Sequence, residues 1–423
     1  MAYSPRVIDA ELQARLASSG AVVLEGPKAC GKTLSARRVA ASEVLLDVDA
    51  DARAAAAIDP ALVLDGQTPR LIDEWQIEPK LWNHVRRAVD DRNLPGQFIL
   101  TGSAVPTDEI TRHTGAARIT RIQMRPMSLF ESGHSTGEIS LGAILDGSSV
   151  RSPSPGHSLP DLVDRVCVGG WPGFQQLSVG DALIAVAAYL DEIRRTDINR
   201  VDGARRDPQR VLKLLRSLAR NIATAATLAK LAADTGEEAG QNGDDRPLAR
   251  NTIYDHLSAL QRLMIIEDQP AWAPHLRSRS RLRTAEKRHF VDPSLAVATL
   301  GASPERLLKD LNFLGFLFES LVTRDLRIYA QHTDARVFHY RDNTELEIDA
   351  IVEARDGRWA AFEVKLGGED AIEQAARNLL RFAQRIDTTR CGEPARLAVI
   401  VATGYGYIRK DGVAVIPVGA LKQ

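Results

Sequence analysis

The segment from Gly26 to Thr33 constrains the fold of this chain more than any other feature. It follows the apolar residues 21–24 and contains, in order, Gly26, Pro27, Lys28, Ala29, Cys30, Gly31, Lys32 and Thr33. This is the complete G-x-x-x-x-G-K-[ST] pattern of a phosphate-binding loop, which joins a buried strand to a helix. The backbone N–H groups of such a loop surround an anion, and the helix that begins at Lys32 directs its positive end at the same point. The pattern predicts an α/β domain that binds a nucleotide through these eight residues.

Two side chains of this loop carry the expected chemistry. Lys32 is predicted to reach the β- and γ-phosphates, and the Thr33 hydroxyl is predicted to coordinate Mg²⁺. The glycines allow the backbone to approach the nucleotide closely. ATP and Mg²⁺ are therefore the expected cofactors. The alternative is an ordinary glycine-rich turn, but the acidic strand end farther along the chain agrees with a phosphate loop.

Residues 69–75 supply that acidic strand end. The segment is apolar and ends in Asp73 and Glu74, about 40 residues after the phosphate loop, where a Walker B strand is expected. Asp73 is predicted to hold Mg²⁺ together with Thr33. Glu74 is predicted to act as the general base that polarises the attacking water. A solvated pair of acids is the alternative.

A third buried strand, expected at residues 97–103, ends in small polar residues. Either Thr101 or Ser103 can sense the γ-phosphate and position the attacking water, as polar residues do at this place in AAA-like ATPases. The alternative is ordinary turn chemistry, since Thr-Gly-Ser is a common way to leave a strand.

These motifs together resemble a prokaryotic family of AAA-like ATP-binding proteins with a C-terminal domain of unknown function. The resemblance rests on four segments, at Ile72–Gln76, Thr101–Ser103, Gly115–Arg118 and Arg125–Glu131. It implies that Arg118 acts as an arginine finger, in its own chain or in a neighbouring subunit of a homo-oligomer. Arg112, Arg121 and Arg125 crowd the same region, so the choice among these arginines stays open.

Length and composition narrow the class of protein. With 423 residues the chain is too long for one core, so several domains are expected. A net charge of −1 gives no global field that attracts nucleic acid. The three cysteines are far apart, which favours a reducing compartment over a disulfide framework or a zinc site. The sequence shows no signal-peptide core and no apolar stretch of about 18 residues, so we expect a cytoplasmic protein without a membrane span.

The middle of the chain has the element order of a winged helix-turn-helix. Helices are expected at 212–223, 227–233 and 251–260, followed by a strand at 263–267. Such a domain can either place Thr252, Tyr254 and His256 in a DNA groove or serve as a packing module. The basic residues of segment 275–288 are the candidate contact to a nucleic-acid backbone, with a solvated charged hairpin as the alternative. They are Arg277, Arg279, Arg281, Arg283, Lys287 and Arg288.

The C-terminal region carries the pattern of a PD-(D/E)xK nuclease. A helix at 313–329 bears Glu319, a strand at 345–352 bears Asp349, and a strand at 359–365 bears Glu363 and Lys365. Residues two apart on a strand share a face, so Glu363 and Lys365 converge, and Asp349 can join them from the neighbouring strand. Asp349 and Glu363 are predicted to bind Mg²⁺, which would activate water, while Lys365 orients the nucleophile or stabilises charge. A structural ion pair is the alternative, and Glu345 and Glu347 are alternative acids.

The sequence thus predicts an α/β protein of three parts. These are a P-loop AAA-like ATPase core at 1–150, a helical and winged-helix domain at 160–300, and a PD-(D/E)xK nuclease-like domain at 301–423. The family resemblance implies the same C-terminal fold. One hypothesis is a Mg²⁺-dependent ATPase that acts on DNA or RNA, with a C-terminal domain that binds or cleaves it. The other is a nucleotide-dependent protein-interaction switch in which the nuclease fold is inert.

Overall fold

The computed structural model describes residues 3–103, 114–236, 247–274 and 285–423, which form two compact units. The first unit contains residues up to Pro126 together with 196–205 and 259–265. The second unit contains 127–195, 206–258 and 266–423. Each unit is built around its own sheet, and the two are considered separately.

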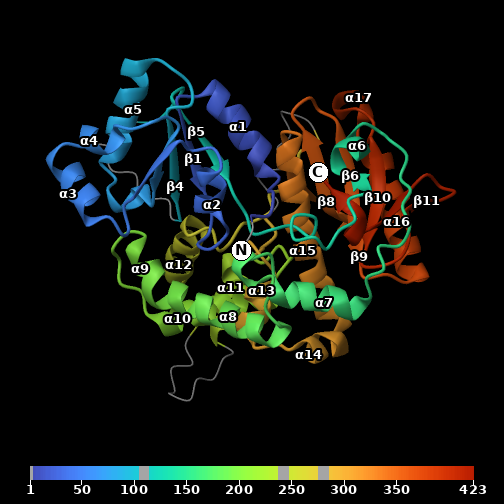
Figure 1. The fold of residues 1–423 in the computed structure, drawn as a ribbon. Coiled ribbons are helices and arrows are strands. Elements are labelled where there is room, and N and C mark those ends of the chain that lie inside the picture. Colours follow the sequence, from blue (N-terminus) through green and yellow to red (C-terminus); the bar gives the residue numbers. More distant parts are fainter. Residues whose placement is uncertain (1–2, 104–113, 237–246, 275–284) are drawn as a thin grey trace. The chain divides into compact units, whose positions relative to one another are not determined.

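The first unit has a five-stranded parallel sheet in the order β2-β3-β4-β1-β5. Its inner strand β1 is apolar and buried at the four residues before Glu25, as expected in a parallel sheet that is covered on both faces. Figure 1 shows α1 and α5 on opposite sides of β1, β4 and β5. The elements are α1 (Ile8–Ser18), β1 (Ala21–Glu25), α2 (Lys32–Arg37), β2 (Ser42–Leu45), α3 (Ala50–Ile58), α4 (Ala61–Leu64), β3 (Arg70–Asp73), α5 (Leu81–Arg92), β4 (Phe98–Gly102), β5 (Ile119–Gln123) and α9 (Ile198–Arg200).

Alternate residues of β1 belong to two different cores. Ala21 and Val23 pack with Trp82 and Val85 of α5, while Val22 and Leu24 pack with Leu12 and other residues of α1. This alternation follows from the two-residue period of a strand. The phosphate loop therefore leaves a strand that is fixed on both faces.

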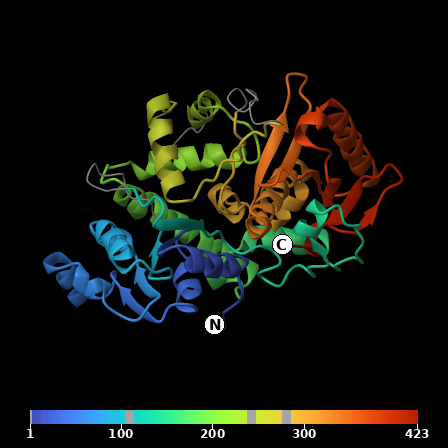
Figure 2. The same ribbon diagram turned by 90° about the horizontal axis from the view of Figure 1, so that it is seen from above.

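The second unit has a six-stranded mixed sheet in the order β11-β12-β10-β9-β8-β7. Neighbours β9, β10 and β12 are parallel, and β7, β8 and β9 are antiparallel. The helix α15 packs against β7, β8 and β9, and α16 packs against β8, β9 and β10. Figure 2 shows the red helix α16 beside the orange and red strands. The elements are α15 (Leu311–His332), β7 (Ala335–Arg341), β8 (Glu347–Ala354), β9 (Trp359–Lys365), α16 (Glu369–Arg385), α17 (Thr388–Cys391), β10 (Arg396–Val401), β11 (Tyr407–Ile408) and β12 (Ala414–Pro417).

Helices form most of the remaining second unit. Several begin with a side-chain cap. In α7, Ser158 and Asp161 form a reciprocal capping box. These helices are α6 (Leu141–Leu145), α7 (Leu159–Val168), α8 (Val179–Glu192), α10 (Pro208–Arg220), α11 (Leu228–Gly236), α13 (Ser294–Leu300) and α14 (Pro304–Lys309), while α12 (Arg250–Arg262) extends from the second unit into the first.

The three helices expected in the middle region are α10, α11 and α12. The strand expected after them is reduced to isolated antiparallel bridges that join Ile266 to Phe290 and Gln269 to Lys287. The residues between those bridges include 275–284, which lie outside the described part of the chain. One groove-facing assignment needs correction, because the His256 side chain is buried and cannot reach a DNA groove, whereas Tyr254 is exposed.

The first boundary differs from the sequence-based division at residue 150. Residues from Met127 onward belong to the second unit, where β6 (Ile139–Ser140) pairs in parallel with β13 (Leu421–Lys422) near the end of the chain. A two-residue strand of this kind has no local signal, because its pairing partner lies almost 300 positions away. Because β6 pairs with β13, the residues that follow Met127 belong with the C-terminal part of the chain.

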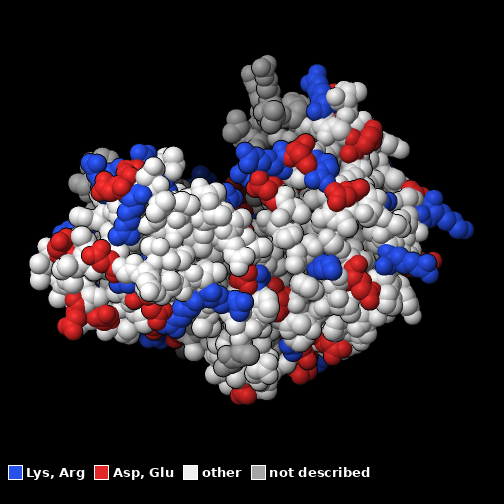
Figure 3. Space-filling view, turned by 45° about the horizontal axis from the view of Figure 1, so that its top comes forward, with Lys and Arg blue, Asp and Glu red and all other residues white. Residues whose placement is uncertain are grey.

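Charges of both signs are interspersed on the face drawn in Figure 3, and the described residues there form no broad region of one sign. Among the described residues, no helix combines the length and hydropathy needed to cross a membrane.

Candidate functional site

Three neighbouring parallel strands bring the predicted ATPase residues to one edge of the first sheet. The loop from Gly26 to Thr33 follows β1, Asp73 ends β3, and Thr101 lies near the end of β4. The sheet order β3-β4-β1 makes these strands adjacent, and Asp73 is the register partner of Thr101. Ligands bind at the carboxyl ends of strands in open parallel sheets, so this edge is the expected place for a nucleotide.

The shape of the phosphate loop depends on two glycines. A Cβ atom on Gly26 would lie 2.3 Å from the Met124 carbonyl oxygen and 2.9 Å from the Cys30 sulfur, so a side chain does not fit there. Gly31 has a φ of 102°, which side chains rarely adopt. The glycine requirement at position 26 thus arises from packing beneath the loop, in addition to the approach of a nucleotide predicted from the sequence.

The loop lysines have partners in the described structure. The Lys32 ammonium donates to the carbonyl oxygens of Gly26 at 2.9 Å and Pro27 at 2.8 Å, which holds it inside the loop. The Lys28 ammonium lies 2.5 Å from the buried Asp197 carboxylate, which follows α8 in the chain. Lys32 is therefore positioned at the centre of the loop, and Lys28 faces a carboxylate.

The residues predicted to hold Mg²⁺ in the first unit lie together. The Thr33 hydroxyl donates to both carboxylate oxygens of Asp73, at 2.9 and 3.2 Å. Hydroxyl and carboxylate oxygens are the ligands that Mg²⁺ takes, and a P-loop site supplies one or two of them beside the phosphates. Thr33 and Asp73 fit such an ion.

Glu74 is held by the side chains of Ser103, which follows β4, and of Gln76. Its backbone has a φ of 53°, in the left-handed region that side chains seldom adopt, and such strain is concentrated at functional sites. Its carboxylate accepts a hydrogen bond from the Ser103 hydroxyl at 3.2 Å and another from the Gln76 side-chain amide. Thr101 instead donates to Asp73 and is fully buried. Of the two sensor candidates, Ser103 is the one that contacts the predicted base.

Arg118 lies at the opposite end of the sheet from the phosphate loop. It immediately precedes β5, whose first residue Ile119 pairs with Ala21 at the start of β1. Its guanidinium pairs with Asp90 at 2.8 Å and is 43% exposed. An arginine-finger role within the same chain is therefore incompatible with this position, because β1 separates Arg118 from the loop at its other end.

Sequence reasoning missed Arg6, which connects the loop to the segment after β5. Its guanidinium is buried and donates to the Cys30 carbonyl oxygen at 2.8 Å and to the Arg125 carbonyl oxygen at 2.7 Å. No motif marks this residue, since a lone arginine near the start of a chain has no characteristic spacing.

The second unit brings the four predicted nuclease-like residues into one cleft of about 460 Å³. The Lys365 ammonium lies 2.7 Å from Glu363 Oε2 and 3.2 Å from Asp349 Oδ2. The second Asp349 oxygen and the Glu319 carboxylate contact Lys287, which sequence reasoning did not place here. The cleft therefore contains two lysines among its carboxylates.

Burial and neighbouring charges separate the pKa values of these acids. Burial, reinforced by the Asp349 charge, raises the pKa of Glu319 to about 8, although Lys287 opposes the shift. Burial and the Asp349 charge likewise raise the pKa of Glu363 to about 8, against Lys365. Burial alone would raise the pKa of Asp349, but Lys365, Lys287 and the Val364 N–H outweigh it and hold that pKa at about 2.

The predicted metal ligands of this cleft are already engaged. Asp349 Oδ2 accepts from the Val364 N–H at 2.9 Å and from Lys365, and Glu363 Oε2 accepts from Lys365. Among the described residues, no group of three or more histidine, cysteine, aspartate or glutamate side chains is placed to hold a metal ion. As arranged here, the Asp349–Glu363 pair does not fit a divalent cation, and its metal role stays a prediction.

Lys287 and Arg288, which belong to the described part of the basic segment, do not lie on an open surface. Lys287 is 1% exposed inside the cleft, and Arg288 pairs with Asp268. Neither is available to a nucleic-acid backbone as the sequence predicted. The remaining arginines of that segment, from Arg277 to Arg283, lie outside the described residues, as does Arg112.

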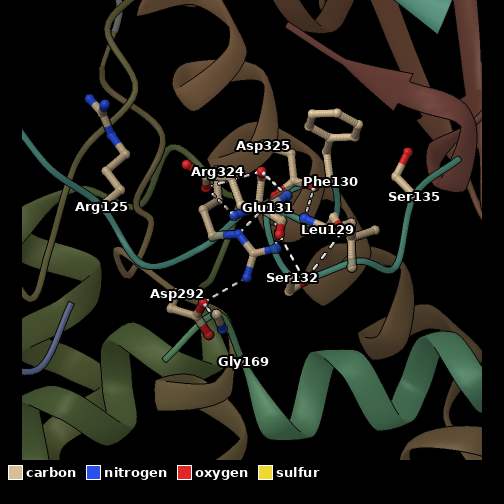
Figure 4. Close-up of polar contacts among 12 residues, drawn as sticks. Arg125, Leu129, Phe130, Glu131, Ser132, Ser135, Gly169, Asp292, Arg324 and Asp325 are labelled. Atoms are coloured by element: carbon tan, nitrogen blue, oxygen red, sulfur yellow. Dashed lines mark hydrogen bonds and ion pairs between the residues drawn. The ribbon is translucent and has the colours of Figure 1, made fainter. Parts of the chain in front are cut away.

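A buried ion network joins α15 to the segment around Leu129 and to the Gly-Gly turn at Gly169 and Gly170. Arg324 on α15 pairs with Asp292 and with Asp325, each at 2.7 Å. Asp325 also accepts from the Leu129 backbone N–H at 3.0 Å, and Asp292 accepts from the Gly170 N–H at 2.9 Å. Figure 4 shows Asp292, Asp325 and Leu129 grouped around Arg324. The segment around Leu129 and the Gly-Gly turn are thus anchored to α15, which is a structural role.

Three protein families match successive parts of the chain. The AAA domain family matches residues 18–132, the Domain of unknown function (DUF8612) matches 159–306, and the Domain of unknown function (DUF4143) matches 314–421. These matches support an AAA-like ATPase with further domains of unknown function.

Two mycobacterial proteins are similar over nearly the whole chain. Uncharacterized proteins of Mycobacterium bovis and Mycobacterium tuberculosis are each 23% identical over 414 residues, covering 96% of this chain and 82% of theirs. The Aeropyrum pernix ORC2 protein, solved as ADPNP–ADP complexes, is 14% identical with a TM-score of 0.31, covering 73% of this chain and 90% of that one. A TM-score this low does not establish a shared fold.

Proposed function

We propose that the first unit is a Mg²⁺-dependent ATPase. The observation that carries this proposal is the contact between the Thr33 hydroxyl and the Asp73 carboxylate at the carboxyl edge of the sheet. It joins the end of the phosphate loop to the end of the acidic strand, as a P-loop ATPase requires. The AAA domain match over 18–132 supports the same chemistry.

Each residue of this edge has a distinct role in hydrolysis. Lys32 exchanges the carbonyl oxygens of Gly26 and Pro27 for phosphate oxygens and stabilises the negative charge that develops during transfer. Glu74, oriented by Ser103 and Gln76, accepts the proton of the attacking water. Thr33 and Asp73 hold Mg²⁺, which supplies charge neutralisation between the phosphates when it is bound.

The ATPase is proposed to control binding of a partner by the second unit. We infer that this partner is a protein and not nucleic acid. Lys287 and Arg288 are engaged in ion pairs, and the carboxylates expected to cleave a phosphodiester are bonded to lysines. This supports the nucleotide-dependent switch, with nucleic-acid binding or cleavage as the competing hypothesis.

One experiment tests both parts. ATP turnover by the full chain is measured with and without Mg²⁺, and with single-stranded DNA, double-stranded DNA or RNA added, while cleavage of the same nucleic acids is followed. We expect Mg²⁺-dependent turnover that none of the three changes, and no cleavage. Absence of turnover contradicts the ATPase, whereas stimulation or cleavage favours the nucleic-acid hypothesis and leaves the ATPase intact.

A further inference from the structure

The cleft of the second unit contains a lysine at the point where several carboxylates meet. The Lys287 ammonium lies 2.6 Å from Glu319 Oε1, 2.7 Å from Glu347 Oε1 and 3.5 Å from Asp349 Oδ1. These acids come from α15 and from two positions on β8. A single nitrogen thus has carboxylate oxygens on three sides.

Lys287 is fixed in this place by its backbone as well as by its side chain. Its N–H donates to the Gln269 carbonyl oxygen at 3.0 Å, and the Gln269 N–H donates back at 2.9 Å. The Gln269 side-chain amide in turn donates to the carbonyl oxygens of Phe338 and Asp349. This antiparallel bridge therefore connects the lysine to β8, which carries Glu347 and Asp349, and the lysine side chain is 2% exposed.

Converging carboxylates of this kind ordinarily surround a divalent cation with oxygen ligands. A metal ion and an ammonium group cannot both occupy the centre of one such cluster, because like charges repel and the space is filled. The charge balance also depends on the lysine. Buried carboxylates without a partner cost several kcal/mol, so an internal cation stabilises them. The burial and the three contacts indicate that Lys287 supplies that cation.

We propose that Lys287 takes the place of a divalent metal in the cleft of the second unit. The unmodified chain then binds no divalent cation among Glu319, Glu347 and Asp349. Removing the ammonium group while keeping the fold opens a cation site among these carboxylates. This inference does not depend on whether the first unit hydrolyses ATP.

The test is binding of Mn²⁺ to the nucleotide-free full chain, measured by electron paramagnetic resonance. All proteins carry Asp73→Asn, so that Thr33 and Asp73 do not contribute a second site. The variants compared in this background are Lys287→Met, the double variant Lys287→Met/Asp349→Asn, and Asp349→Asn alone. Arg381→Met is the matched control, since Arg381 lines the same cleft and removes an equal charge.

With Lys287 present, we expect no Mn²⁺ binding that depends on Asp349. Lys287→Met is expected to gain one Mn²⁺ per chain, bound at least about 10-fold more tightly than in the parent, and Asp349→Asn should abolish the gain. Arg381→Met should gain none. A folded Lys287→Met protein without a new site, or with a gain that Arg381→Met reproduces, overturns the proposal.

If Lys287→Met fails to fold, Mn²⁺ binding by the parent is compared with Mn²⁺ binding by Asp349→Asn. Tight Mn²⁺ binding in the parent that is lost in Asp349→Asn means that the lysine yields to the metal, which overturns the proposal. Equal, weak binding by both proteins supports it.

Discussion

At the residue scale, the phosphate loop combines a fixed backbone with one movable charge. Gly26 and Gly31 fix the loop, whereas the Lys32 ammonium is satisfied by two loop carbonyl oxygens that a phosphate can replace. A lysine held in this way is already close to its ligand and costs little reorganisation when the ligand arrives.

Lys32→Ala is therefore expected to weaken ATP binding by about 100-fold, since hydrogen bonds to charged groups contribute roughly 1.5–3 kcal/mol each. Isothermal titration calorimetry with ATP and Mg²⁺ measures the change. Lys80→Ala, which removes an exposed lysine from the same unit, is the control and should bind like the wild type. Unchanged affinity in Lys32→Ala would show that the loop does not hold the phosphates.

Gly26→Ala tests the packing beneath the loop. The new methyl group would meet the Met124 carbonyl oxygen at 2.3 Å, and overpacking of this kind costs about 1–3 kcal/mol. Urea denaturation measures the free energy of unfolding. Gly315→Ala is the control, because that position in α15 is open and alanine there should stabilise the helix by about 0.5–1 kcal/mol. If Gly26→Ala is as stable as the wild type, the packing argument is wrong.

Local patterns identified several single residues but not Lys287. Gly26, Lys32 and Asp73 belong to short motifs whose chemistry is tied to their spacing. Lys287 lies 32 positions before Glu319 and 62 before Asp349, in a stretch whose composition suggests a solvated basic hairpin. One weak signal was available, because the chain has only 10 lysines among its 54 basic residues, which makes any lysine unusual. The role of Lys287 depends on its burial against strands that are distant in the sequence, and no local pattern indicates that burial.

At the element scale, strand order makes the nucleotide edge. The carboxyl ends of β1, β3 and β4 meet because these strands are parallel neighbours, so three separate motifs become one site. The apolar runs and their spacing allowed this sheet to be predicted. The helices of the middle region were also found by their periodicity, but the short β6 and its pairing with β13 were not, because two residues carry no period.

The helix α15 acts as an anchor through Arg324. This arginine compensates Asp292 and Asp325, both buried, and the two acids bind backbone N–H groups of separate segments. Arg324→Met leaves two buried charges unpaired and should destabilise the protein by about 3–5 kcal/mol. Thermal and urea unfolding measure the loss. Arg306→Met, at an exposed arginine of α14, should change the free energy of unfolding by less than about 0.5 kcal/mol. Equal stabilities would exclude an anchoring role.

At the scale of the whole molecule, Arg118 raises the question of assembly. It lies at the far end of β1 from the loop, so Arg118 can act as an arginine finger only on the loop of another copy of the chain. On this hypothesis Arg118→Ala lowers ATP turnover by about 10³-fold. Mixing it with the equally inactive Lys32→Ala restores measurable turnover, because an intact loop then meets an intact arginine. Full activity of Arg118→Ala, or no restoration on mixing, would remove Arg118 from this role.

Glu74 is assigned as the base of the proposed Mg²⁺-dependent ATPase, and the Glu74→Gln variant tests this role without changing the size of the side chain. Glutamine keeps the size of the side chain and its neighbours Ser103 and Gln76 but cannot accept the proton. Its ATP affinity and its steady-state turnover are measured side by side with those of the wild type. We predict unchanged affinity and turnover that is lower by about 10²- to 10⁴-fold. Equal turnover in the two proteins would contradict the assignment of Glu74 as the base.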